Sequence, residues 1–138
     1  MVLFDWRMIE AVESFSKYLL VFVGGGLGSC ARLAISEAFG SKSGSFPWAT
    51  LAANLTGALL LGVVMGALSR GWISGSARLF LAVGLLGGYT TFSTFCFEGV
   101  NLLRERQSGI YVGYVLVSVV GGLLLAWLGF LVTIGKQS

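Results

Sequence analysis

Four long apolar stretches, separated by short polar segments, follow one another along most of the chain. They cover residues 18–39, 48–68, 78 or 79–100 and 110–134. Each is long enough to cross a bilayer core of about 30 Å as a helix that rises about 1.5 Å per residue. Residues 40–45 form a polar loop, and Pro47 suits the first turn of the second helix. The pattern therefore predicts an all-α membrane protein with four transmembrane helices.

The third apolar stretch is interrupted by residues 87–95, which read Gly-Gly-Tyr-Thr-Thr-Phe-Ser-Thr-Phe. Paired glycines let a chain leave helical geometry and expose its carbonyl groups. Lipid cannot satisfy open amide groups, so such an interruption is expected only where the backbone lines a cavity or lies buried in protein. The sequence therefore predicts a broken third helix with an ion or substrate site beside it.

Residues 1–17 predict an amphipathic helix ahead of the first span. One face of this helix collects the apolar side chains of Phe4, Met8, Ala11, Val12 and Phe15. A helix of this kind is expected to lie in the membrane interface. The chain therefore divides into an amphipathic N-terminal segment and a four-helix transmembrane domain over residues 18–138.

Composition and charge agree with a membrane protein. The chain is 56% hydrophobic and 11% charged, against about 25% charged residues in soluble proteins, and its mean hydropathy is +0.88. Its formal net charge is +3, but the charges sit mainly at segment ends, so the basic balance gives no indication of nucleic-acid binding.

The basic residues at the ends of the spans are nearly balanced between the two sides of the membrane. Four crossings place both termini on one side. That side holds Arg7, Lys17, Arg70, Arg78 and Lys136, and the other holds Lys42, Arg104 and Arg106. A bias of this size does not fix one orientation under the positive-inside rule, so insertion in both orientations is allowed.

Two polar side chains lie well inside the first two spans. Arg32 would cost about 3 kcal/mol at the middle of a membrane, so it must face protein, water or an anion, or extend to the headgroups. Asn54 has Thr50 one turn before it on the same face. Its amide can donate two hydrogen bonds to an anion, or it can serve as a hydrogen-bonding link between helices.

The interrupted third span carries two phenylalanines, Phe92 and Phe95, that are neighbours on one face if the chain is helical there. The positive edges of their rings can attract a small bare anion. Ordinary packing is the alternative, but the interleaved hydroxyl residues, which include Thr94, favour an anion. Glu98 is a candidate coupling or gating acid, although its closeness to the polar loop favours a solvated charge at a helix end.

In the fourth span, Tyr114, Ser118 and Gly122 share one face at four-residue spacing. They present a phenol and a hydroxyl group in one direction. Ser118 taken alone is better explained by a hydrogen bond to a carbonyl group of its own helix, one turn back. Only together with the third span do these residues indicate a polar pathway.

Small residues recur at four-residue spacing in three spans. The sets are Ala58, Gly62 and Gly66; Gly24 and Gly28; and Gly109 and Gly113. Such spacing lets helix backbones approach closely, and four helices alone leave little room for a water-filled pathway. We therefore expect a dimer whose interface includes these helices, with packing inside one chain as the alternative.

Three motifs resemble the Fluc or CrcB family of fluoride channels. They are residues 24–32, Gly-Gly-Gly-Leu-Gly-Ser-Cys-Ala-Arg; residues 46–54, Phe-Pro-Trp-Ala-Thr-Leu-Ala-Ala-Asn; and residues 87–95. The resemblance covers nearly the whole chain after its N-terminal segment. It implies passive export of fluoride ion across the lipid of the cell inner (plasma) membrane, through pores of an antiparallel, dual-topology homodimer with a structural sodium ion at its centre.

The resemblance also implies roles for individual residues. The fluoride pore that it implies involves Arg32, Asn54, Phe92, Thr94, Phe95, Glu98, Tyr114 and Ser118. It implies that the carbonyl groups of Gly87 and Thr90 bind sodium, two from each subunit. Gly122 stands where relatives often continue the polar track with another hydroxyl group, so here the track is expected to be shorter or completed by water.

Two other functions compete with a channel. One is a small four-helix, proton-coupled exporter of toxic compounds, which would be expected to carry an acid in its first helix, where this chain has Arg32. The other is a non-transporting membrane subunit whose polar residues only join helices. An enzyme is not expected, because no nucleophile, base and orienting group come together along the chain.

Overall fold

The computed structural model describes residues 6–40 and 46–135, and within them the side chains from residue 14 onward. All regular structure in these ranges is helical. Four segments are long and apolar enough to cross a membrane: Ser14–Phe39, Trp48–Ser69, Gly75–Arg104 and Ser108–Ile134. The predicted all-α membrane protein with four membrane-spanning helices is thereby confirmed.

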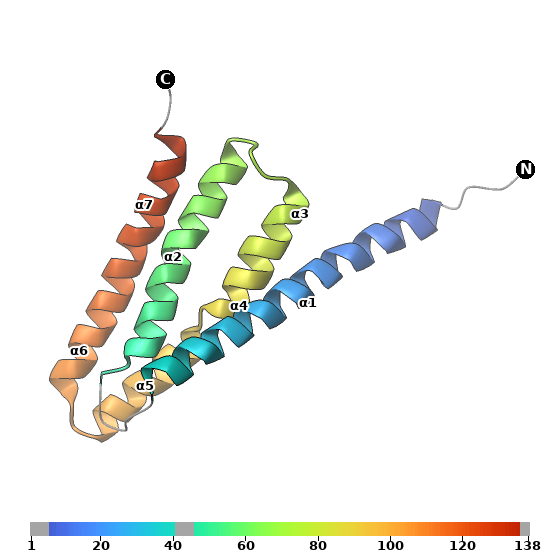
Figure 1. The fold of residues 1–138 in the computed structure, drawn as a ribbon. Helices are drawn as coiled ribbons and strands as arrows, with labels where there is room; N and C mark the ends of the chain where they lie inside the picture. Colours follow the sequence, from blue (N-terminus) through green and yellow to red (C-terminus); the bar gives the residue numbers. More distant parts are fainter. Residues whose placement is uncertain (1–5, 41–45, 136–138) are drawn as a thin grey trace, which may run out of the picture.

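The first helix, α1 (Trp6–Phe39), is a single unbroken rod of 34 residues that projects past the other helices (Figure 1). It joins the predicted amphipathic segment to the first span without a bend at residue 17. Most side chains that define the amphipathic face lie outside the described ones, so its place in the membrane interface stays a prediction. The helix ends at Gly40, whose φ of +64° is the left-handed conformation that glycine adopts at low cost.

The second and fourth spans pack against each other along their length. The second span is α2 (Trp48–Ser69), which starts directly after Pro47. The fourth joins α6 (Ser108–Leu116), a π-helical turn η2 (Val117–Gly121) and α7 (Gly122–Ile134) into one rod. A Cβ atom at Gly62 would collide with the carbonyl oxygen of Ala126, so these two backbones are in direct contact.

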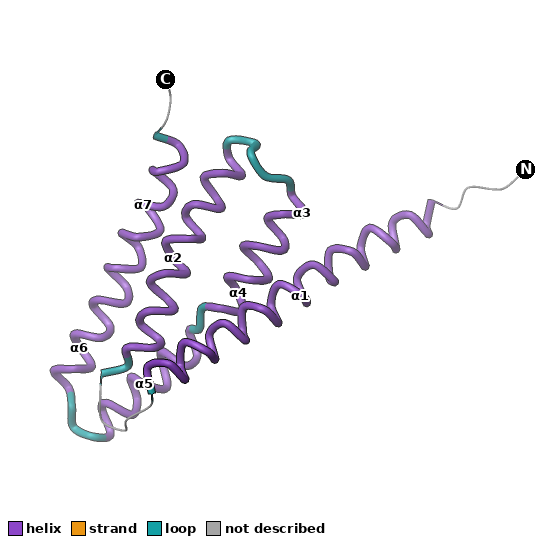
Figure 2. Tube along the Cα trace, in the orientation of Figure 1, coloured by secondary structure: helices purple, strands orange, loops and turns teal. Residues whose placement is uncertain are grey.

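The third span contains a break at Thr90 and Thr91. Before it come α3 (Gly75–Arg78), the π-helical η1 (Leu79–Leu86) and α4 (Gly87–Tyr89), and after it comes α5 (Phe92–Arg104). Thr90 and Thr91 are extended, with ψ of 158° and 121°. Figure 2 shows this break as a short loop between two helical parts.

The glycines at four-residue spacing have different surroundings. A Cβ atom at Gly24 or Gly28 would collide with backbone atoms of η1, and one at Gly66 would collide with Thr133. At Gly109 and Gly113 a Cβ atom would meet nothing within 4 Å. Packing inside one chain therefore accounts for the glycines of these sets on α1 and α2. Of the three sets, only the pair on α6 is open to a neighbouring molecule.

The core lies where α2, α5 and α6 meet, next to the break. Its buried members are Leu51, Leu102 and Tyr114, with Phe46, Leu55, Phe95 and Tyr111 packed against them. Most other large apolar side chains of the described helices are exposed, as expected where lipid surrounds a protein. The helices around the break are thus held on one side by packed side chains.

Candidate ion-binding pocket at the helix break

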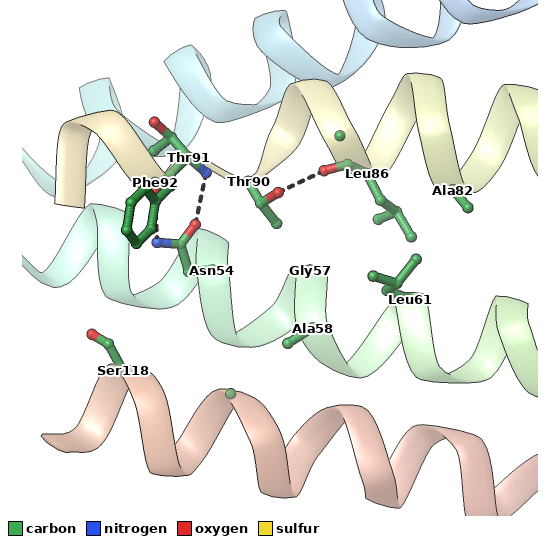
Figure 3. A pocket seen from close by; sticks show the side chains of 12 residues that line it. Asn54, Gly57, Ala58, Leu61, Ala82, Leu86, Thr90, Thr91, Phe92 and Ser118 are labelled. Atoms are coloured by element: carbon green, nitrogen blue, oxygen red, sulfur yellow. Dashed lines mark hydrogen bonds between the residues drawn. The ribbon is translucent and has the colours of Figure 1, made fainter. Parts of the chain in front are cut away.

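The side chain of Asn54, on α2, holds the break from across the bundle. Its Nδ2 donates to the carbonyl oxygen of Thr91 at 3.0 Å, and its Oδ1 accepts from the backbone N–H of Thr91 at 2.8 Å (Figure 3). One amide thus replaces both partners that a continuous helix would have supplied. The second N–H of Asn54 has no partner among the described residues and remains available to a ligand.

The other backbone groups at the break are also redirected. The Thr91 hydroxyl accepts the N–H of Thr94 at 3.3 Å and so caps α5, and it donates to the hydroxyl of Thr94 at 3.0 Å. In a continuous helix, the Thr91 and Thr94 N–H groups would bind the carbonyl groups of Gly87 and Thr90. Those two carbonyl groups therefore lose their helical donors.

Arg32 lies at the same break but not in the pocket. Its Nε donates to the carbonyl oxygen of Gly88 at 3.2 Å, and its side chain is half-buried. Of the alternatives open from sequence, contact with protein is the one that this hydrogen bond shows.

A pocket of about 360 Å³ opens beside the break. It lies between α2, η1 and the fourth span and is lined by Asn54, Gly57, Ala58, Leu61, Ala82, Leu86, Gly87, Thr90, Thr91, Phe92, Ser118 and Gly122. Figure 3 shows two ends: Asn54, Thr91, Phe92 and Ser118 gather at one, and Leu61 and Ala82 lie at the other. None of these lining residues is charged, so the polar end offers neutral N–H and O–H groups to a ligand.

Ser118 supplies a hydroxyl group to this pocket. Its Oγ is buried and has no hydrogen-bond partner among the described residues. A buried polar group without a partner is costly, so this hydroxyl fits a site that a small ligand or water completes. The bond to its own helix, which we considered from sequence, is not formed.

The two phenylalanines divide between the pocket and the core. Their ring centroids are 6.0 Å apart and tilted by 38°. Phe92 lines the pocket and is 77% exposed. Phe95 is half-buried and packs on Tyr114, at 5.1 Å between ring centroids. The pair is therefore adjacent, as its spacing predicts, but only one ring reaches the pocket.

Glu98 is not the solvated helix-end charge that the sequence favoured. Its Oε1 accepts from the Thr50 hydroxyl at 2.8 Å, and its Oε2 accepts from the Tyr114 phenol at 2.7 Å. Thr50 and Tyr114 are buried, and Glu98 is half-buried. The carboxylate thus joins α2, α5 and α6, because two hydroxyl donors replace the water that a solvated charge would hold.

Not all of the polar residues on the fourth span reach the pocket. Ser118 and Gly122 line the pocket, whereas Tyr114 is fully buried in the core. Tyr114 lies one turn before Ser118, where Phe46 and Phe95 pack on its ring and bury it, and four-residue spacing in the sequence gives no sign of that cover. Tyr114 therefore supports the site from behind rather than lining it.

Sequence reasoning missed two contributors to the site. One is Thr50, whose hydroxyl donates to Glu98. Its position one turn before Asn54, on the same helix face, could have identified it from the sequence. Gly57 lines the pocket, and a Cβ atom there would collide with the methyl group of Thr90. Only the packed structure identifies that contact, because a glycine in a glycine-rich helix is not distinctive.

Comparison with known proteins places this geometry in context. Residues 19–130 match the family described as CrcB-like protein, Camphor Resistance (CrcB). A fluoride-specific ion channel FluC of Thermus thermophilus is 45% identical over 115 residues, which are 83% of this chain and 91% of that protein.

Two further relatives carry the same name. The fluoride-specific ion channel FluC of Methylobacillus flagellatus is 44% identical over 117 residues, which are 83% of this chain and 91% of the relative. That of Bacteroides fragilis is 39% identical over 117 residues, which are 82% of this chain and 92% of the relative. The matched region contains all four predicted spans almost entirely, together with the break.

Proposed function

This chain belongs to the CrcB family, and from that premise we propose that it is a fluoride-specific ion channel. It is a multi-pass membrane protein with four membrane-spanning helices, and it is not an enzyme, because the family is one of ion channels. The inner (plasma) membrane is the location that we propose.

The observation that carries the proposal is the polar end of the pocket. The amide of Asn54, the unpartnered hydroxyl of Ser118 and the ring of Phe92 all line this end of the pocket, and no lining residue is charged. Donors and ring edges of this kind can replace part of the water around a small anion. Because no fixed cation lines the pocket, an anion can also leave it, as conduction requires.

The direction of the broken helices adds to this argument. The N-terminus of α5 (Phe92–Arg104) begins at the pocket, and the positive end of a helix dipole favours an anion. The C-terminus of α4 meets the same break with carbonyl groups that favour a cation. One break in the chain therefore supplies separate environments for ions of opposite charge.

The working unit that we propose is an antiparallel, dual-topology homodimer with fluoride pores along the pocket. Ser29 and Thr56 are exposed well inside their spans, and polar groups at such depth are disfavoured against lipid. The near-balanced basic residues, five against three, leave both orientations open. A second copy facing the opposite way would cover these groups.

Sodium is the structural ion that we propose for the centre of such a dimer. The carbonyl groups of Gly87 and Thr90 fit it, because the donors that a continuous helix would give them bind Asn54 and Thr91 instead. Hard cations prefer oxygen ligands of this kind. When bound, the ion would neutralise the carbonyl ends of two α4 helices, one from each subunit.

Sodium exchange tests this site. Dialysing the purified dimer extensively against N-methylglucamine should lower fluoride flux, and added sodium should restore it. Because trapped sodium could survive dialysis, the residual metal must be measured by mass spectrometry. Full flux in protein shown to contain no sodium would contradict a required ion.

Fluoride efflux from liposomes tests the proposed function itself. With a potassium gradient and valinomycin setting the membrane potential, the purified protein should release fluoride, measured by a fluoride electrode, without a proton gradient. Chloride-loaded and protein-free liposomes are the controls. Fluoride release that occurs only with a proton gradient would indicate a coupled exporter, and none under either condition would indicate a non-transporting subunit.

A further inference from the structure

Helices α1 and α4 touch through their backbones beside the break. A Cβ atom at Gly88 would collide with the carbonyl oxygen of Gly25, and one at Gly28 would lie 2.8 Å from the backbone nitrogen of Tyr89. Such contact is possible only because these positions lack side chains. It brings the next polar residues of α1 against the end of α4.

Two side chains of α1 reach one carbonyl group there. The Nε of Arg32 donates to the carbonyl oxygen of Gly88 at 3.2 Å, and the Oγ of Ser29 lies 3.5 Å from the same oxygen. In a continuous helix, this carbonyl would accept from the N–H four residues later, at Phe92. Phe92 instead begins α5, so Arg32 takes the place of the missing helical donor.

We propose that Arg32 is a positioning residue of the pore, whose Nε–H fixes the end of α4 through the Gly88 carbonyl. The hydrogen bond, rather than the guanidinium charge, is what transport requires of this residue. Arg32 does not line the pocket, so it acts on a permeating ion through the break. The inference rests on the proposed channel function for its flux readout.

The reason lies in how the break is held. Asn54 binds Thr91 from α2, and Arg32 binds Gly88 from α1. These three hydrogen bonds hold Gly88 and Thr91, which lie on either side of Thr90, from two different helices. Loosening the Gly88 bond would let α4 move relative to α5, and with α5 the ring of Phe92 and the cap at Thr91.

Three substitutions separate the hydrogen bond from the charge. Arg32→Gln places an N–H donor at the same atom of the side chain as Nε but removes the charge. Arg32→Lys keeps the charge but places a methylene group there, and Arg32→Met keeps the length with neither. Flux should stay near the wild-type rate in Arg32→Gln and fall about tenfold in the other two, as for the loss of one hydrogen bond.

Hydrogen exchange provides a readout that needs no fluoride. In reconstituted protein, the peptide that spans residues 86–93 should exchange as slowly in Arg32→Gln as in the wild type, and faster in Arg32→Lys and Arg32→Met. Ser29→Ala is the matched control on the same carbonyl. Its longer contact predicts a much smaller change in both measurements.

The possible results are distinct. Wild-type flux in Arg32→Lys together with a loss in Arg32→Gln would assign the role to charge and overturn the inference. Wild-type behaviour of Arg32→Met in both measurements would overturn it as well. If the wild type itself carried no fluoride, the proposed function would fail, and the order of exchange rates would still decide whether Arg32 holds the break.

Discussion

Single side chains at the break have two kinds of task. Asn54 pairs with both backbone groups of Thr91 and keeps one N–H for a ligand. From the sequence, Asn54 could either donate to an anion or link two helices. The geometry allows the one side chain to do both. Glu98 and Tyr114, by contrast, act on the core side, where their hydrogen bond joins α5 to α6.

At the residue scale, the two phenylalanines should separate binding from stability. Phe92→Ile should lower fluoride flux and reduce the free energy of unfolding less than Phe95→Ile does, because the Phe92 ring lines the pocket and is 77% exposed. An ion contact of about 1.4 kcal/mol at the barrier corresponds to a tenfold slower passage. Liposome flux and unfolding in detergent measure the two effects.

Phe95→Ile should lower both the fluoride flux and the free energy of unfolding. Its ring packs on Tyr114 at 5.1 Å, and aromatic pairs contribute about 1 kcal/mol beyond their buried area. Phe97→Ile is the matched control, since Phe97 is 63% exposed on α5 and lines no part of the pocket. Wild-type flux in folded Phe92→Ile protein would assign that ring to packing alone.

At the scale of elements, glycines set how closely the helices approach. Gly62→Ala should destabilise the protein by about 1–3 kcal/mol, because its Cβ atom would collide with the carbonyl oxygen of Ala126 on α7. The free energy of unfolding in detergent is the measurement.

Gly113→Ala on α6 is the control for this prediction. Its Cβ atom would meet nothing within 4 Å inside the chain, and alanine is the better helix former by about 1 kcal/mol. This variant should be unchanged or more stable as a monomer. Equal destabilisation by both substitutions would mean that the contact between α2 and α7 is not what requires glycine.

At the scale of the whole molecule, the basic residues at the ends of the spans bear on its orientation in the membrane. The C-terminal end of α7 lies at the same end as the connection between α2 and α3, and the connection between α5 and α6 lies at the other (Figure 1). With five basic residues against three at the ends of the spans, both orientations should occur. A C-terminal tag should then react with an impermeant reagent from either face of the membrane.

The control for this experiment is an outward-facing and an inward-facing marker protein in the same cells. About half of the tag should react from outside in intact cells, and the rest only after lysis, as the positive-inside rule allows for a balanced chain. A tag that reacts from one face alone in every molecule would contradict dual topology and the antiparallel dimer with it.

The sequence by itself determined the four spans, the family and the position of the break. These follow from local properties: apolar length against bilayer thickness, the motif of residues 87–95, and the need of open backbone groups for partners. The tertiary structure decided which partners those groups have. Gly88 binds Arg32 and Thr91 binds Asn54, pairings between separate helices that no spacing within one helix encodes.

The tertiary structure also decided which side each polar residue faces. Tyr114 is buried in the core while Ser118 lines the pocket, because the rings of Phe46 and Phe95 pack on Tyr114. Glu98, in the middle of α5, is held by Thr50 and Tyr114 because α2 and α6 place these hydroxyl groups beside it. The number of residues between Glu98 and the polar loop predicted contact with water. The packed helices around Glu98 removed that contact.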